Sequence, residues 1–272
     1  MTELVFLKLG GSLITDKSQP QALRADVLFR LAREIAEALA TRPGLRLLLG
    51  HGSGSFGHMT ARQYGTRAGV RTAAQWRGFA ETGRVAAELN RLVADALAAA
   101  GVPALRIQPS ASAQCEDGEL ASLAERPITE AIARGLVPVV HGDVAFDSVR
   151  GGTIMSTEEI FSYLARRLQP ARILLAGEVD GVLTADPANG IAGDVIPVIR
   201  AAHVRDVENV IGGSRGVDVT GGMVAKVREM AALAASVPGL REIHILSGLV
   251  PGLVRDALLR DDLPVGTRIL GK

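Results

Sequence analysis

Hydrophobic residues fall into short runs that alternate with stretches of helical periodicity along the whole chain. The short runs predict strands at residues 4–9, 45–49, 104–107, 136–141, 173–176, 242–246 and 267–270. Apolar residues three and four positions apart predict helices at residues 23–39, 73–100, 120–134, 156–168, 219–235 and 251–259. Strands that alternate with helices are typical of a mostly parallel sheet with helices on both faces. We therefore predict an α/β fold, a three-layer αβα sandwich.

Local signals add detail to this outline. Ser156 is suited to cap the helix that follows it, because Glu159 stands three residues on, at the spacing of a capping box. Residues 144–154 predict a hairpin. The chain shows no internal repeat, low-complexity linker or clear boundary, so we expect one domain over residues 1–272. The stretch 178–220, rich in Gly, Asp and Pro, is the best candidate for a second lobe or a lid.

The composition indicates a globular protein without a nucleic-acid or membrane surface. The chain has 272 residues, 47% of them hydrophobic, and a formal net charge of +1 without a basic block. The one cysteine, Cys115, excludes an intramolecular disulfide and fits a reducing cytoplasm. No apolar run approaches the roughly 18 residues of a membrane span. Glu3 and Lys8 interrupt the N-terminal run, so no signal peptide is predicted, and we expect a soluble cytoplasmic protein.

The strongest chemical signal is a glycine-rich turn after the predicted strand 45–49. Its sequence is Gly50-His51-Gly52-Ser53-Gly54-Ser55-Phe56-Gly57-His58. Glycines let the backbone turn tightly and direct N–H groups toward an anion, so this turn predicts a phosphate cradle with His58 at its exit. Similar turns follow the first predicted strand at residues 8–12 and open a late helix at 218–222. Together the turns predict a phosphoryl-transfer site with a donor side and an acceptor side.

Other interpretations of the second turn are weaker. Residues 52–57 formally match the G-x-G-x-x-G of dinucleotide-binding folds. That fold places an acidic residue at the end of the next strand, whereas the predicted strand 104–107 ends in Gln108-Pro109. The chain contains no G-x-x-x-x-G-K-[ST] motif, so a P-loop is not supported. An ordinary strand-to-helix turn remains the alternative.

Basic residues lie near each glycine-rich turn: Lys8, Lys17 and Lys226. Separated lysines can neutralise a transferring phosphoryl group, whose charge is spread over its equatorial oxygens. An isolated surface lysine is usually only a solvated charge, but a lysine inside an apolar strand, as Lys8 is, is rarely accidental. Asp180-Gly181, after the predicted strand 173–176, either accepts ribose hydroxyls or forms a simple turn.

Further side chains are candidates for the acceptor side. His58 titrates near neutral pH, so it can hold an acceptor phosphate and respond to its charge; a core histidine or a helix cap is the alternative. The segment 141–143 (His-Gly-Asp), at the end of another predicted strand, predicts a second polar site at the same sheet edge. Trp76, Phe79 and Tyr64 either line an apolar pocket or pack in an ordinary core.

In this order the motifs resemble the amino acid kinase superfamily. The resemblance is carried by residues 8–12, the second glycine-rich turn, residues 179–182 (Val-Asp-Gly-Val), and residues 218–223 with Lys226. Within the superfamily the chain is most similar to the isopentenyl phosphate kinase family, through residues 16–17, 55–58, 107–110 and 141–143. The histidine that ends the glycine-rich turn is similar to the residue that holds the phosphate of the substrate in that family.

The resemblance implies ATP-dependent phosphorylation of isopentenyl phosphate to isopentenyl diphosphate. Mg²⁺ would arrive with ATP and need few protein ligands, so no residue is assigned to the metal. The part of the chain up to about residue 168 would bind the acceptor, and the part from about residue 169 would bind the nucleotide. The resemblance also implies a homodimer.

The same resemblance implies roles for single residues. Lys8, Lys17 and His58 would act in catalysis, with Lys17 stabilising the transition state. The acceptor phosphate would be bound by Ser53, Gly57, His58 and Thr157. ATP would be bound by Lys8, Gly10, Gly11, Ser12, Gly54, Glu178, Asp180, Gly222 and Lys226.

The chain departs from the family pattern in three places. Ser53 stands between two glycines where the family often has a third glycine. Ser-Thr-Glu-Glu at residues 156–159 replaces Ser-Gly-Asp-Asp, which keeps two acids and removes a glycine. Gly177-Glu178 replaces the Thr-Asp that usually precedes Val-Asp-Gly.

Rival functions remain open at this point. One is phosphorylation of another acceptor, such as a phosphonate like fosfomycin or a different alkyl monophosphate. Another is a non-catalytic nucleotide-binding sensor, against which stands the presence of every expected phosphate-contacting lysine. A nicotinamide oxidoreductase is disfavoured by the missing acidic residue.

Overall fold

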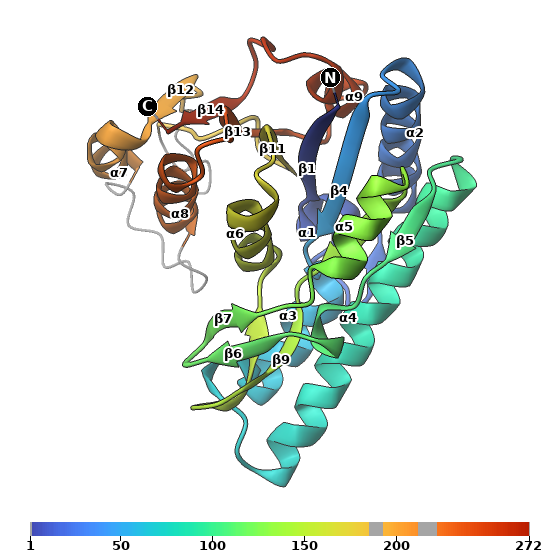
Figure 1. Ribbon diagram of the computed structural model, residues 1–272. Coiled ribbons are helices and arrows are strands. Elements are labelled where there is room, and N and C mark those ends of the chain that lie inside the picture. The colour runs from blue at the N-terminus through green and yellow to red at the C-terminus, as the bar shows by residue number, and fades with distance from the viewer. Residues whose placement is uncertain (1, 185–192, 212–221, 272) are drawn as a thin grey trace.

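An eight-stranded sheet forms the centre of the molecule (Figure 1). The computed structural model describes residues 2–184, 193–211 and 222–271. In spatial order the strands are β12 (Val198–Arg200), β14 (Thr267–Leu270), β13 (Glu242–Ser247), β11 (Arg172–Gly177), β1 (Glu3–Leu9), β4 (Leu45–His51), β8 (Val137–His141) and β5 (Ala104–Arg106). Neighbouring strands are parallel except β13 and β14. The predicted mostly parallel sheet is therefore confirmed.

Helices cover both faces of this sheet, which confirms the predicted three-layer αβα sandwich. One layer contains α2 (Ala25–Thr41), α4 (Ala73–Ala99) and α9 (Leu253–Leu259). The other layer contains α5 (Arg126–Ala133), α6 (Thr157–Leu168) and α8 (Gly222–Ser236). Helices α1 (Gly11–Ile14) and α3 (Gly54–Tyr64) follow the ends of β1 and β4. Within the described ranges, no helix is long and apolar enough to cross a membrane.

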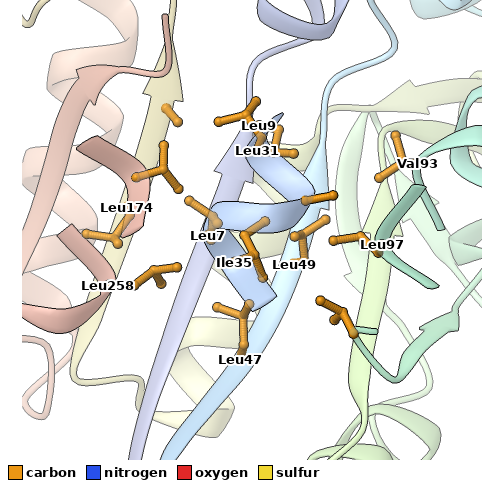
Figure 2. Close-up of a cluster of buried hydrophobic side chains, with 14 of the residues drawn as sticks. Leu7, Leu9, Leu31, Ile35, Leu47, Leu49, Val93, Leu97, Leu174 and Leu258 are labelled. Atoms are coloured by element: carbon orange, nitrogen blue, oxygen red, sulfur yellow. The ribbon is translucent and has the colours of Figure 1, made fainter. Parts of the chain in front are cut away.

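Two apolar cores lie between these layers, and the alternation of side chains along β1 assigns residues to each. Val5, Leu7 and Leu9 belong to the core under α2 and α9. Phe6 and Lys8 lie on the opposite face of the strand, and Phe6 belongs to the core under α6. Figure 2 shows the first core, with Leu7, Leu9, Leu47 and Leu49 from the strands and Leu31, Ile35, Val93 and Leu97 from the helices.

A second sheet of four strands extends beyond the first one, beside α4 (Figure 1). Its spatial order is β10 (Gly151–Met155), β9 (Asp143–Asp147), β6 (Gln114–Glu116) and β7 (Glu119–Ser122). Strands β9 and β10 are antiparallel and form the predicted hairpin. This sheet places polar and apolar side chains next to the carboxyl edge of the main sheet.

The helix predicted at residues 120–134 is wrong in its first half. Glu119–Ser122 form β7, and α5 begins only at Arg126. Pro127 explains where α5 begins, because proline lacks an N–H group and is tolerated only in the first turn of a helix. The preceding residues pair with β6 instead, and this partner is invisible to local periodicity.

Other boundaries differ by a few residues. Leu23 lies in β3 (Ala22–Leu23), which pairs with β2 (Thr15–Asp16), so α2 begins later than predicted. Ser156 caps α6 through a capping box, as its spacing predicts. Of the candidate lobe, the part from residue 193 contributes β12 and α7 (Val204–Ile211) at one end of the main sheet. Residues 185–192 and 212–221, which include the start of the helix predicted at 219–235, lie outside the described residues.

A cavity in the first core, beneath β4, is expected to lower the free energy of unfolding strongly. Leu47 is 1% exposed and packs in this core, so Leu47→Ala is expected to lower the free energy of unfolding by about 3 kcal/mol. Leu105 lies in the edge strand β5 and is 40% exposed, so Leu105→Ala should cost only about 0.5 kcal/mol. Urea unfolding measures both values, and equal losses would contradict the assignment of Leu47 to the core.

Candidate active site

The first two glycine-rich turns touch each other at the carboxyl edge of the main sheet. They follow β1 and β4, which are neighbouring parallel strands. A Cβ atom on Gly11 would lie 2.4 Å from the backbone nitrogen of Gly54, and one on Gly52 would lie 2.8 Å from that of Gly11. Any side chain at Gly11 or Gly52 would force the turns apart, so both positions require glycine. Because β4 extends to His51, the second turn is shorter than predicted.

Backbone N–H groups at this contact are available to a ligand. Within the part of the chain that the structure describes, the N–H groups of Gly11, Ser12, Ser53 and Gly54 donate to no protein acceptor. Ser53 and Gly54 form the N-terminus of α3, which carries the positive end of the helix dipole. This arrangement suits an anion with several oxygens, such as a phosphate group.

The hairpin of β2 and β3 is fastened to the first turn of α3. The Thr15 hydroxyl donates to the Gly11 carbonyl (2.7 Å) and accepts the Ser55 N–H (3.0 Å). The Ser55 hydroxyl accepts the Ala22 N–H (3.2 Å). Lys17 lies in the exposed turn of this hairpin, so these bonds determine where its ammonium group can reach. No local sequence signal marks Thr15, and the motif that contains Ser55 does not indicate these bonds, because they join backbone groups of distant elements.

One carboxylate holds two of the predicted lysines. Lys8 lies on the α6 face of the sheet, and its Nζ is 2.5 Å from Oε1 of Glu158, the second residue of α6. The Lys226 Nζ lies 3.7 Å from the same oxygen. In the sequence Glu158 stood out only as a departure from a family motif. Its contact with Lys8 spans 150 positions, so no local pattern indicates it.

This arrangement lowers the pKa of both Glu158 and Lys8. Burial alone would raise the pKa of the Glu158 carboxyl, but the positive charges of Lys8 and Lys226 lower that pKa to about 2. Burial also lowers the pKa of the Lys8 ammonium, and the attraction of Glu158 offsets this only in part because Lys226 repels it. With both ammonium groups protonated the trio carries one net positive charge, which suits an incoming phosphate.

His58, predicted at the exit of the glycine-rich turn, lies in the second turn of α3, because the helix already begins at Gly54. Its side chain is exposed. Partial desolvation, followed by the positive charges of Lys17 and Lys8, lowers the pKa of its imidazole. This shift favours the neutral form of the ring in the ligand-free protein. Both lysines therefore lie near enough to His58 for their charges to act on its ring.

The remaining residues predicted for the acceptor lie close to these groups. Ser53 and Gly57 pack together at the start of α3, where a Cβ on Gly57 would lie 2.6 Å from that of Ser53. The Thr157 side chain is buried, and its hydroxyl donates to the His51 carbonyl at 2.6 Å. That bond ties the first residue of α6 to the end of β4.

The residues predicted for the nucleotide follow β11 and open α8. Glu178 pairs with Arg24 at 2.6 Å, a partner that the sequence did not indicate. Asp180 is exposed two residues further on. Gly222 is the first residue of α8, and residues 218–221 of the third glycine-rich turn lie outside the described residues.

A buried pair of histidines supports the glycine-rich turns from behind. His51 and His141 end the neighbouring strands β4 and β8, and their rings stack with centroids 5.6 Å apart. The Asn90 amide of α4 lies 3.1 Å from Nε2 of His51. Burial, followed by the proximity of His141, lowers the pKa of His51 to about 3. Asp143 is also buried and accepts the Ser110 N–H, so segment 141–143 is a buried support and not an open polar site.

A cavity of about 320 Å³ lies between α4 and β9. Phe79 and Phe146 line it with ring centroids 5.4 Å apart, and Trp76 packs edge-on against Phe79. Tyr64 lies elsewhere, with its ring against Gly78. The other lining residues are Ala80, Gly83, Arg84, Ala87, Gln108, Ser110, Val144 and Ala145. Both sequence interpretations hold in part, because Phe79 lines a cavity while Trp76 packs beside it.

Known proteins resemble the chain over nearly its whole length. The model of the amino acid kinase family matches residues 3–247. The isopentenyl phosphate kinase of Methanothermobacter thermautotrophicus is 38% identical, with 99% of this chain and 100% of that protein covered. The enzyme of the same name from Haloferax volcanii is 41% identical over 85% of this chain and 89% of its own. A solved isopentenyl phosphate kinase matches with a TM-score of 0.82 at 35% identity, covering 98% and 100% of the two chains.

The charge trio predicts a specific dependence of stability on pH. Replacing Glu158 by Gln leaves two ammonium groups facing each other, so E158Q is expected to lower the free energy of unfolding by about 3 kcal/mol near neutral pH. The folded pKa of about 2 lies below the ordinary value of 4.5, so this contribution is present above pH 4.5 and is lost as the pH falls toward 2.

Urea unfolding of wild type and E158Q at pH 7, 5, 4 and 3 measures this difference. We expect the gap between the two proteins to be constant from pH 7 to 5 and to lose more than half of its size by pH 3. The exposed Glu130 of α5 provides the matched control, E130Q, which should show no such gap. A gap that widens on acidification would contradict the charge assignment.

Proposed function

The chain belongs to the amino acid kinase family, and from that premise we propose that it transfers the γ-phosphoryl group of ATP to isopentenyl phosphate. The products are isopentenyl diphosphate and ADP. The observation that carries the proposal is the contact between two glycine-rich turns, with Lys8, Lys17 and His58 beside it. Relatives that match most of the chain bear the name of this activity, which supports the same acceptor.

The proposed step is an in-line displacement at the γ-phosphorus. An oxygen of the acceptor phosphate forms a bond to that phosphorus, the bond to the bridging oxygen breaks, and its electron pair leaves with ADP. The attacking oxygen already carries negative charge, so no general base has to remove a proton. The task of the protein is to position the two phosphates end to end and to neutralise their charge.

On the donor side we infer that ATP is bound by Lys8, Gly10, Gly11, Ser12, Gly54, Glu178, Asp180, Gly222 and Lys226. These residues fit a triphosphate, because they combine N–H groups without an acceptor among the described residues with two ammonium groups that Glu158 holds together. Glu158 itself is already paired, which fits a metal ion held by the phosphates more than by the protein. Mg²⁺ that is bound to ATP supplies further neutralisation of charge.

On the acceptor side we infer that Ser53, Gly57, His58 and Thr157 surround the phosphate of the substrate. The neutral His58 ring donates a hydrogen bond to a phosphate oxygen, and a phosphate dianion beside it raises the pKa of the ring. Thr157 contributes its backbone N–H, because its hydroxyl is bonded to the His51 carbonyl. Lys17, carried by the β2–β3 hairpin, stabilises the charge that develops between the two phosphates.

The cavity beside α4 favours an acceptor with a short hydrocarbon chain. Phe79, Val144 and Phe146 provide it with apolar walls, against which burial of hydrocarbon is favourable. Arg84, Gln108 and Ser110 are the only polar side chains among its lining residues, so the charged groups of glutamate, or the sugar and base of UMP, would lose more hydration there than these partners replace. This difference supports an alkyl phosphate as the acceptor.

We further propose how the chain is organised in the cell. It forms one domain, in which the part before about residue 169 binds the acceptor and the rest binds the nucleotide. Two copies form a homodimer, and the protein works in the cytoplasm. These proposals rest on the family resemblance and on the single cysteine, which fits a reducing compartment.

Release of ADP by the purified chain with ATP and Mg²⁺ tests the proposed reaction. The acceptors compared are isopentenyl phosphate, fosfomycin, carbamate, glutamate and UMP. Saturable turnover on isopentenyl phosphate, well above that on the others, is the expected result. Turnover on fosfomycin instead would mean that the same reaction takes place on a phosphonate acceptor. Tight ATP binding without turnover on any acceptor would favour a non-catalytic sensor.

Two substitutions separate the transition-state role of Lys17 from the acceptor-binding role of His58. Lys17→Ala is expected to lower kcat about 100-fold with little change in KM, because Lys17 acts on charge that develops in the transition state. His58→Ala is expected to raise the KM of the acceptor about tenfold or more, because a hydrogen bond to a charged group is lost. Steady-state kinetics measures both effects.

The controls are exposed neighbours on the same elements. Gln19→Ala lies in the same hairpin as Lys17, and Gln63→Ala lies on the same helix as His58. Both should retain wild-type constants within about twofold. Full activity of Lys17→Ala and His58→Ala together would refute the assignment of these residues.

A further inference from the structure

Arg67 lies in a segment that continues the helix of the acceptor side. It is the central residue of η1 (Thr66–Ala68), which is separated from the end of α3 by Gly65 alone. Gly65 adopts a φ of +62°, which turns the chain sharply after Tyr64. Whatever fixes η1 therefore also restrains α3 and His58.

The guanidinium of Arg67 binds groups that lie outside η1 and α3. Its Nη2 lies 2.8 Å from Oε1 of Glu159, and its Nη1 lies 3.2 Å from Oε2 of the same carboxylate. Nη1 also donates to the Ile154 carbonyl at 3.1 Å. An exposed ion pair usually contributes little, but a two-pronged contact with a further backbone bond fixes geometry. In addition the Thr153 hydroxyl donates to the Arg67 carbonyl at 3.2 Å.

Glu159 belongs to the same helical turn that holds the lysines. It is the third residue of α6, and its carboxylate also accepts the Ser156 N–H in the capping box of that helix. The preceding residue, Glu158, holds Lys8 and Lys226. The first turn of α6 therefore contacts the donor side through Glu158 and the acceptor side through Glu159.

Arg67 also balances a local excess of negative charge. Besides Glu159, the carboxylates of Glu119 and Glu229 act on its guanidinium. Glu229 and Glu159 also repel each other, and the positive charge of Arg67 offsets this repulsion. A neutral side chain of similar size removes both the two-pronged contact and this balance.

We propose that Arg67 is a positioning residue, which holds η1 and α3 against the first turn of α6 and thereby sets the place of His58 relative to the lysine pair. The inference rests on the proposed function, because it assigns α3 to the acceptor. Without the contact, the arrangement that binds the acceptor is populated less, and the apparent affinity falls in proportion. Bound acceptor restores the arrangement, so the maximal rate and the affinity for ATP are retained.

Two variants and their combination test this inference. Arg67→Gln removes the charge, and Glu159→Gln keeps the capping box, in which Gln serves as well as Glu. Each is expected to raise the KM of the acceptor about tenfold, while kcat and the KM of ATP stay within about twofold. The double variant should be no worse than either single one, because both remove the same contact.

The matched control is Arg62→Gln, at an exposed position in the last turn of α3. No side-chain hydrogen bond or ion pair of Arg62 is seen among the described residues, so this variant should keep the wild-type KM. Additive effects in the double variant, a loss confined to kcat, or equal effects of Arg62→Gln and Arg67→Gln would each overturn the inference.

Amide hydrogen exchange of the ligand-free protein provides a readout that does not depend on the acceptor. Arg67→Gln is expected to speed exchange in Gly54–Tyr64 about tenfold, with α2 and α9 unchanged. Unchanged exchange in this helix would overturn the inference. If wild type fails to phosphorylate isopentenyl phosphate, the proposed function fails, while the exchange experiment still decides whether Arg67 restrains α3.

Discussion

The backbone of Gly11 packs so closely on Gly52 and Gly54 that a single added carbon would separate them. This contact joins the ends of two neighbouring strands, and it brings together two sets of N–H groups that have no acceptor among the residues the structure describes. Further hydrogen bonds stabilise the same arrangement. Thr15 and Ser55 fasten the Lys17 hairpin to the same point, and the proposed transfer needs this proximity because donor and acceptor phosphates must lie end to end.

A lysine within the central strand imposes a second constraint. Burial of the Lys8 ammonium is unfavourable unless a carboxylate accompanies it, and the first turn of α6 supplies Glu158. Negative side chains are also favourable at a helix N-terminus, so Glu158 and Glu159 stabilise α6. At the same time Glu158 forms ion pairs with lysine side chains, and Glu159 forms one with an arginine side chain. The same turn thus combines helix capping, charge compensation and the proposed connection between the two halves of the site.

Local sequence rules predicted most elements, and their failures have identifiable causes. The capping box at Ser156 and the hairpin of β9 and β10 were predicted correctly because both depend on residues a few positions apart. The first half of the helix predicted at residues 120–134 was wrong because Pro127 and pairing with β6 outweighed the apolar spacing. The second glycine-rich turn is shorter than predicted because Gly54, with a φ of +49°, already begins a helix, although glycines usually interrupt helices.

The amino-acid sequence was sufficient for the α/β class, the family and the glycine-rich turns, because each depends on residue types at short, regular spacings. Only the folded chain shows that Lys8 and Lys226 share Glu158, that Phe146 joins Phe79 at the cavity, and that segment 141–143 is buried. These contacts join residues far apart in the sequence. These contacts arise from the order of the strands in the sheet and from the face of the sheet to which each side chain points. Packing of the whole core decides both.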